Sequence, residues 1–146
     1  MTTKRSIRAV LDTNLFVSGL FSTGGTTGRL QDLWMTGTFE LAVSEEILQE
    51  IKATLQKPHI RKELFLLENE IDEIISLIRE KALVVTQDLY QTDKILSDPD
   101  DNKFLGCALE IKADYIVSGD NHLLSLKHSH GTQIVDAASF IKKITG

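Results

Sequence analysis

The sequence contains very little cysteine and no long hydrophobic run. Cys107 is the only cysteine among 146 residues, which excludes an intrachain disulfide and a structural zinc site. No apolar stretch approaches the roughly 20 residues that cross a bilayer, and residues 1–7 are too polar for the centre of a secretory signal. We therefore expect a cytoplasmic protein with no membrane partner, in which Cys107 is a buried apolar residue rather than a nucleophile.

Proline is scarce, and no segment has the composition of a linker. Pro58 and Pro99 are the two prolines, and we find no internal repeat and no low-complexity stretch. The length is close to the commonest size of one domain. We predict a single domain over residues 1–146.

Positive charge is in deficit, with a formal net charge of -5. Binding to nucleic acid usually requires a basic surface, so the total first argues against it. The acidic excess is partly concentrated at Asp98, Asp100 and Asp101, where bound cations would invert the local field. The net charge therefore leaves the partner open.

Short apolar segments alternate with amphipathic ones along most of the chain. This alternation predicts an α/β fold, in which a parallel sheet is covered on both faces by helices. The expected strands are 7–11, 39–43, 83–85, 115–117 and 133–135. A loop is expected at 22–28, and helices are expected at 28–35, from the cap Ser44 to Pro58, and at 61–67, 70–81, 98–111, 121–126 and 136–144.

Asp12 follows a predicted strand directly, and Ser118-Gly119-Asp120 closes another, so both acids stand at the carboxyl ends of predicted strands. In parallel α/β sheets, ligands bind beyond the carboxyl ends of the strands, where the strand order reverses. Each residue also has an ordinary structural explanation, since Asp12 can cap a turn and Asp120 can cap a helix. Position alone does not decide between these explanations.

Two helices are expected to add further acids. Asp98, Asp100 and Asp101 fall within four positions, and their mutual repulsion favours metal binding by at least one of them. Asp101 is the best candidate because it precedes core-facing residues of the same helix. Glu46 and Glu50 lie one turn apart on another helix; Glu46 suits the helix dipole, whereas Glu50 borders the apolar stripe and should point toward the sheet edge.

These acids together predict a divalent metal site. Carboxylates that lie close together destabilise each other unless a cation intervenes. Oxygen ligands without His or Cys favour Mg²⁺ or Mn²⁺ over zinc, and Mg²⁺ commonly completes its ligands with water and substrate phosphate. We predict a pocket formed by Asp12, Glu50, Asp101 and Asp120 that acts on a phosphodiester.

The sequence resembles the PIN-domain ribonucleases. The resemblance is carried, in order and spacing, by Val10-Leu11-Asp12-Thr13-Asn14, by the acidic helix at 44–55, by Asp98-Pro99-Asp100-Asp101-Asn102-Lys103-Phe104-Leu105 and by Ala113-Asp114-Tyr115-Ile116-Val117-Ser118-Gly119-Asp120. It is closest to VapC-like toxin components of type II toxin–antitoxin pairs. It implies a three-layer α/β/α fold with a five-stranded parallel sheet, and Mg²⁺- or Mn²⁺-dependent cleavage of RNA.

The resemblance also implies particular roles. The family's four acids fall on Asp12, Glu50, Asp101 and Asp120, and Glu46 competes with Glu50 for the second place. Asn14 and Ser118 match polar positions that support the metal, while Asp98 and Asn102 lie close enough to assist, Asp98 outside the directly bound ligands. The family further implies a cognate antitoxin and often a homodimer.

Two other functions compete with the ribonuclease. One is a non-catalytic module of the same fold that binds RNA or an antitoxin. The other is a phosphoryl-transfer enzyme with Asp12 as nucleophile, which the sequence opposes because Asp12-Thr13-Asn14 lacks a second acid two residues on.

Other polar groups have simpler explanations. We expect His122, His128 and His130 in a solvated segment rather than at a metal site. The glycine-rich segment 24–28 lacks the spacing of a phosphate-binding P-loop. The basic residues of the middle helices fit a solvated face, whereas Arg29 and Lys103 are expected nearer the pocket. The basic residues in question are Lys52, Lys57, Arg61 and Lys62.

Overall fold

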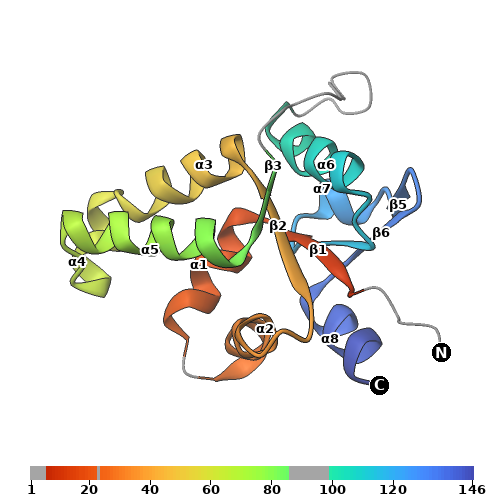
Figure 1. Ribbon diagram of the computed structural model, residues 1–146, viewed down its shortest axis with the longest axis horizontal. Helices are drawn as coiled ribbons and strands as arrows, with labels where there is room; N and C mark the ends of the chain where they lie inside the picture. The colour runs from red at the N-terminus through yellow and green to blue at the C-terminus, as the bar shows by residue number, and fades with distance from the viewer. Residues whose placement is uncertain (1–5, 23, 86–98) are drawn as a thin grey trace.

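The computed structural model describes residues 6–22, 24–85 and 99–146, apart from the side chains of 99–101. Strands and helices alternate along this part of the chain (Figure 1). The strands are β1 (Arg8–Leu11), β2 (Glu40–Ser44), β3 (Leu83–Val85), β4 (Tyr115–Val117), β5 (His128–Ser129) and β6 (Thr132–Val135). The helices are α1 (Thr13–Phe21), α2 (Gly25–Met35), α3 (Glu45–Leu55), α4 (Pro58–Leu64), α5 (Glu68–Lys81), α6 (Pro99–Ile111), α7 (Asn121–Leu124) and α8 (Ala137–Thr145).

The strands form one sheet in the order β3-β2-β1-β4-β6-β5. All neighbours are parallel except β5, which pairs antiparallel with β6. The predicted α/β class is confirmed, but the predicted count of five strands is wrong, because the described residues form six. The additional strand, β5, has only two residues. It is joined to β6 through His130 and Gly131, whose φ angles of 49° and 87° suit a tight hairpin turn.

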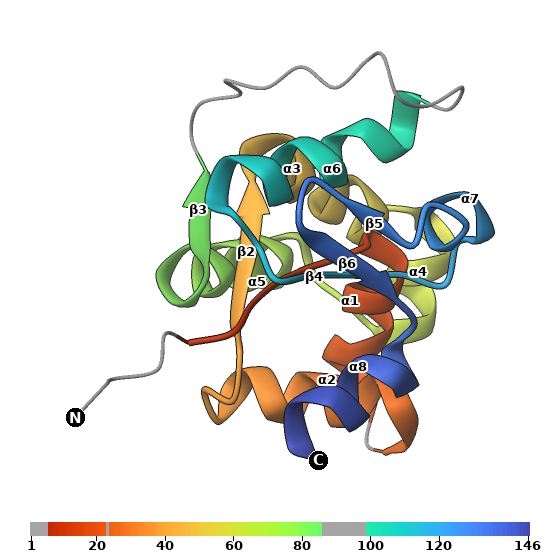
Figure 2. The same cartoon turned by 90° about the vertical axis from the view of Figure 1, so that its right-hand side faces the viewer.

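Helices cover both faces of the sheet, as expected. Figure 2 shows α6 on one side of the strands and α2 and α8 on the other. The strands between them are apolar because both of their faces are buried; Ala9 and Val10 of β1 are fully buried. The Phe140 ring of α8 packs edge-on against Phe39 and Tyr115, with ring centroids 5.1 and 5.3 Å apart. These contacts fix α8 against the sheet.

The helix α1 was not predicted. Its residues 13–21 combine aromatic and β-branched side chains with a glycine, which gives a weak helical signal. The helix starts because the Asp12 carboxylate accepts a hydrogen bond from the Leu15 amide at 2.9 Å, as an N-cap residue does. Asp12 therefore caps a helix and not the turn that was its alternative explanation, and this role coexists with its place at the end of β1.

Several predicted helix boundaries are also wrong. The helix α2 begins at Gly25, so most of the predicted loop at 22–28 is helical. The helix predicted to run to Pro58 ends at Leu55, and Pro58 starts α4, since proline at the first helical position costs no hydrogen bond. The helix predicted at 61–67 therefore lies at Pro58–Leu64, and Phe65 ends it in the left-handed conformation with φ 54°. In the described part of the chain, no helix is long and apolar enough to cross a membrane.

Candidate active site

Asp12 and Asp120 follow β1 and β4, the two neighbouring strands between which the strand order reverses. From β1 the chain builds β2 and β3 on one side, and β4 and β6 lie on the other. The last pair of the β1–β4 register is Leu11 with Val117, so both acids lie at the same edge of the sheet. This is the reversal point at which open α/β sheets bind ligands.

The Asp12 carboxylate is held by three donors. One oxygen accepts the Leu15 amide, and the other accepts the Ser118 hydroxyl at 2.6 Å and the Gly119 amide at 3.2 Å. Ser118 is fully buried. Its hydroxyl oxygen also accepts the Asp120 amide at 2.9 Å. Ser118 therefore links the Asp12 side chain to the backbone of Asp120.

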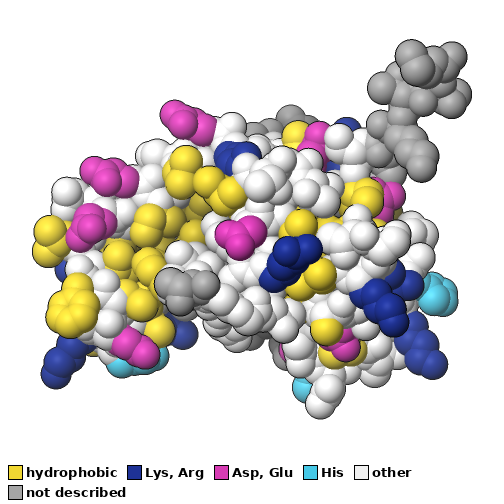
Figure 3. Space-filling model, turned by 90° about the horizontal axis from the view of Figure 1, so that it is seen from below, with side chains coloured by type: hydrophobic (Ala, Val, Ile, Leu, Met, Phe, Trp, Pro, Cys, Tyr) yellow, Lys and Arg dark blue, Asp and Glu magenta, His cyan; other side chains and the backbone are white. Residues whose placement is uncertain are grey.

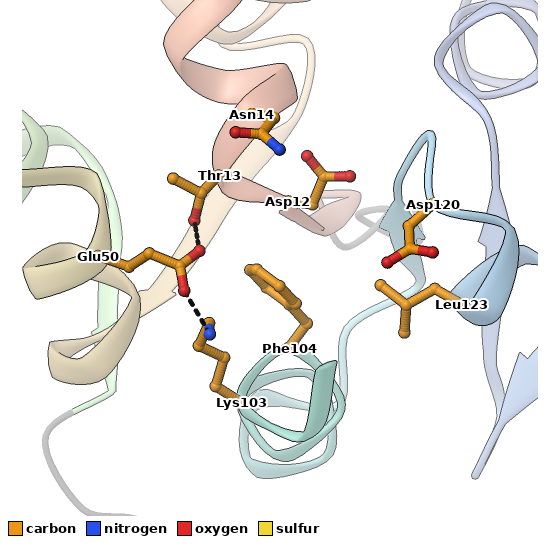
Figure 4. Close-up of a pocket in the computed structure, with 8 residues that line it drawn as sticks. All are labelled: Asp12, Thr13, Asn14, Glu50, Lys103, Phe104, Asp120 and Leu123. Atoms are coloured by element: carbon orange, nitrogen blue, oxygen red, sulfur yellow. Dashed lines mark hydrogen bonds and ion pairs between the residues drawn. The ribbon is translucent and has the colours of Figure 1, made fainter. Parts of the chain in front are cut away.

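Asp120 caps the short helix α7. Its carboxylate accepts the His122 amide at 2.9 Å, and the His122 ring nitrogen Nδ1 lies 3.6 Å from the same oxygen. Asp120 lines the same pocket as Asp12 (Figure 4). As with Asp12, the cap and the pocket position are compatible.

Glu50 reaches the same pocket from α3. Its carboxylate accepts a hydrogen bond from the Thr13 hydroxyl and forms an ion pair with the Lys103 ammonium of α6 (Figure 4). The Lys103 side chain is only 8% exposed, whereas that of Glu50 is 34% exposed. Glu46 is exposed and is not among the residues that line the pocket. Of the two candidates on α3, Glu46 and Glu50, it is therefore Glu50 that lies at the pocket with Asp12 and Asp120.

The pocket has a volume of about 250 Å³. In Figure 4, Glu50 and Asp120 lie on opposite sides of it, and Asp12 and Asn14 lie along its rim. Its lining residues are Asp12, Thr13, Asn14, Glu50, Lys103, Phe104, Asp120 and Leu123. Phe104 and Leu123 give the pocket apolar surface. We did not predict these two as pocket residues, because the sequence alone does not distinguish an apolar residue that lines a pocket from one that packs in the core.

Some predicted site residues cannot be placed in the same way. Asp98 and the side chain of Asp101 lie outside the described residues, although Asp101 is within α6. Asn102 is half-buried on α6, next to Lys103. Lys103 lines the pocket as expected, whereas Arg29 is an exposed residue of α2 and does not.

The donor set at the pocket fits a hard divalent cation. Among the side chains that the structure describes, no group of three His, Cys, Asp or Glu is gathered closely enough to hold a metal. Mg²⁺, however, commonly binds through one or two carboxylates and completes its ligands with water and substrate phosphate. Asp12 and Asp120 offer such a pair of carboxylates. Glu50 offers a third, which the Lys103 ammonium neutralises.

Cys107 is buried and the three histidines discussed above are exposed, as expected. Cys107 is buried, and burial, helped by the charge of Glu110, raises the pKa of its thiol to about 12. His122, His128 and His130 are exposed, and the described part of the chain contains no metal cluster around them.

Comparison with known proteins agrees with this geometry. The PIN domain matches residues 8–122, which include β1, α3, α6 and β4. The chain is also 34% identical over 124 residues to Uncharacterized protein MJ1680 of Methanocaldococcus jannaschii, across 85% of this chain and 77% of that protein. The chain belongs to the PIN-domain family. PIN domains are generally nucleases that use divalent metal ions.

Proposed function

We propose that the protein is a metal-dependent endoribonuclease. The observation that carries the proposal is that Asp12 and Asp120 line one pocket at the reversal point of the sheet. The all-oxygen donors favour Mg²⁺ or Mn²⁺ over zinc. Membership of a nuclease family makes a phosphodiester the natural substrate, and RNA is the form that the sequence resemblance favours.

The chain's residues have distinct roles in this proposal. Asp12 and Asp120 hold the metal, with Asp101 and Glu50 as further ligands and Asp98 outside the directly bound set. Ser118 and the Gly119 amide fix the Asp12 carboxylate, while Asn14 and Asn102 are polar groups that support the site. A bound divalent ion supplies Lewis-acid polarisation of the phosphate and a more acidic water.

The decisive experiment is RNA cleavage with Mg²⁺ or Mn²⁺, with and without chelator. Asp12→Asn and Asp120→Asn keep the shape of each side chain, and Asn remains a good N-cap. We expect each to lose about a hundredfold or more of the activity while its melting temperature stays close to that of the wild type. Asp32→Asn, an exposed change on α2, is the control and should cleave normally. Chelator-resistant cleavage that is equal in all four proteins would exclude the proposal.

The Lys103–Glu50 ion pair favours one alternative, a non-catalytic module that binds RNA or an antitoxin. It engages a carboxylate that a nuclease would use for its metal. A folded protein that retards RNA in a gel but never cuts it, with either ion, would support this reading.

We further propose that the protein acts in the cytoplasm as the toxin of a toxin–antitoxin pair. Induced expression in a bacterial host is then expected to arrest growth, and Asp12→Asn should not. Growth arrest by both proteins would assign the toxicity to something other than RNA cleavage.

We also propose a homodimer, formed through the surface around α4 and the start of α5. Figure 3 shows hydrophobic side chains gathered on the side of the molecule where α4 and α5 lie. Phe65 is 88% exposed and Leu67 is exposed beside it. Charges of both signs border them, such as Arg61 and Glu68, and a surface that carries both signs can pair with its own copy about a two-fold axis.

A further inference from the structure

Lys103 is the cation that the pocket already contains. Its side chain is 8% exposed, and its ammonium pairs with Glu50 and lies 5.4 Å from the centre of the Phe104 ring. An ammonium removed from water is costly unless an anion compensates it. Glu50 provides this anion, and the Thr13 hydroxyl fixes the other oxygen of the same carboxylate. The pair is therefore a built arrangement and differs from the exposed ion pairs elsewhere, such as that of Lys52 with Asp72.

This pair limits what Glu50 can do for a metal. While Lys103 holds Glu50, the pair has no net charge, and Glu50 adds no attraction for a divalent ion at Asp12 and Asp120. Glu50 becomes available only when the ammonium finds another anion. A phosphodiester entering the pocket carries one negative charge and would be such a partner.

We propose that Lys103 couples metal binding to substrate binding by moving between Glu50 and the substrate phosphate. Without substrate, Lys103 occupies Glu50 and weakens metal binding. With a phosphodiester present, Lys103 pairs with the phosphate and releases Glu50 toward the metal. Metal and substrate then raise each other's affinity, as linkage requires. This inference rests on the proposed function, because it takes the anion to be a phosphodiester.

The first test measures Mn²⁺ affinity without RNA, from the electron paramagnetic resonance signal of free Mn²⁺. Lys103→Met removes the competing charge and keeps the length of the side chain. We expect the affinity for Mn²⁺ to rise about tenfold. Lys103→Arg keeps the charge and should bind like the wild type. Lys81→Met is the matched control, since Lys81 also lies over an aromatic ring, that of Trp34, but outside the pocket. This variant should bind Mn²⁺ with the affinity of the wild type.

A double-mutant cycle separates this competition from general electrostatics. If Lys103 acts by occupying Glu50, Lys103→Met should raise the Mn²⁺ affinity strongly in the protein that retains Glu50. In the Glu50→Gln background, the same change should raise the affinity only slightly. An equal gain in both backgrounds, or no gain in either, would overturn the inference. Melting temperatures show whether each variant is folded, and Lys103→Gln replaces Lys103→Met if the latter is not.

The second test uses a minimal phosphodiester. Dimethyl phosphate carries the single charge of an RNA linkage, and trimethyl phosphate has a similar shape without charge. We expect dimethyl phosphate to raise the Mn²⁺ affinity of the wild type, trimethyl phosphate to have no effect, and the rise to be smaller in Lys103→Met. A rise of the same size in both proteins would show that Lys103 does not couple the two ligands.

The outcomes distinguish this inference from the proposed function. Neither test needs RNA cleavage. If the double-mutant cycle gives the expected larger gain in the presence of Glu50 but the protein never cuts RNA, the nuclease proposal is refuted. The competition between Lys103 and the metal for Glu50 then still stands. A protein that cuts RNA through Asp12 but shows equal gains in the cycle would refute this inference alone.

Discussion

At the scale of single residues, the site depends on how its acids are held. Asp12 receives three hydrogen bonds, and Ser118 supplies the shortest of them from a fully buried position. A side chain that orients a metal ligand commonly matters almost as much as the ligand itself. We therefore expect Ser118 to act as a positioning residue for Asp12, the metal ligand that we propose.

We expect Ser118→Ala to lower both Mn²⁺ affinity and RNA cleavage by about 10–100-fold. The variant leaves the Asp12 carboxylate in place but removes its shortest donor and the acceptor of the Asp120 amide. Ser118→Thr keeps the hydroxyl and should retain more of both. Ser125→Ala, an exposed residue after α7, serves as control. Wild-type Mn²⁺ affinity in Ser118→Ala would show that the hydroxyl does not orient Asp12.

Cys107 gives a second prediction at this scale. Burial holds its thiol neutral well above physiological pH, with a pKa of about 12, and the thiolate is the reactive form. We expect no alkylation by iodoacetamide in the native protein at pH 8, and complete alkylation in denaturant, read by mass spectrometry. Rapid modification of the native protein at pH 8 would mean that the helix α6 opens readily.

At the scale of elements, the sequence predicted what periodicity and caps encode. The strands β1, β2, β3, β4 and β6 and the helices from α2 onward were recognisable from apolar spacing and from residues such as Ser44 and Pro99. The helix α1 was not, because its one clear signal, the Asp12 cap, could equally mean a turn. The strand β5 was not, because two residues carry no periodicity.

The sequence predicted the positions of site residues at strand ends, but not the contacts between helices that complete the pocket. Asp12 and Asp120 could be placed at strand ends because parallel strands all end at one edge. The partner of Glu50 could not be foreseen, since the contact of Lys103 with α3 depends on how two helices distant in sequence pack. Phe104 and Leu123 were indistinguishable from ordinary core residues for the same reason.

The cap of α8 gives a prediction about pH. The Ser139 amide donates to the Asp136 carboxylate at 2.8 Å and lowers its pKa. A lowered pKa means that the stabilisation is present above the pKa of the unfolded chain and is lost as the pH falls through the folded value. We expect Asp136→Ala to lower the free energy of unfolding by about 1 kcal/mol at pH 7, and this difference to shrink below about pH 4. Urea unfolding at several pH values measures it, and a difference that persists at pH 2 would contradict the assignment.

At the scale of the whole molecule, the proposed homodimer depends on the apolar surface at Phe65. Phe65→Asp places a charge in that surface, and Asp tolerates the left-handed backbone of this position better than Phe. We expect the wild type to sediment as a dimer and the variant as a monomer with an unchanged circular dichroism spectrum. Met35→Gln alters an exposed apolar residue on α2 and should remain dimeric. A monomeric wild type, or a dimeric Phe65→Asp, would exclude this surface as the interface.

The pairing of β1 with β4 has a consequence during synthesis. Asp12 and Asp120 are separated by 108 positions (120 minus 12), and β1 lacks one of its two neighbours until β4 exists. At about 5–20 residues per second, a ribosome needs roughly 5–20 s to travel from one acid to the other. Throughout that time the growing chain has no pocket. The ribonuclease that we propose would therefore be unable to cut the message from which it is being translated until most of its sequence has emerged.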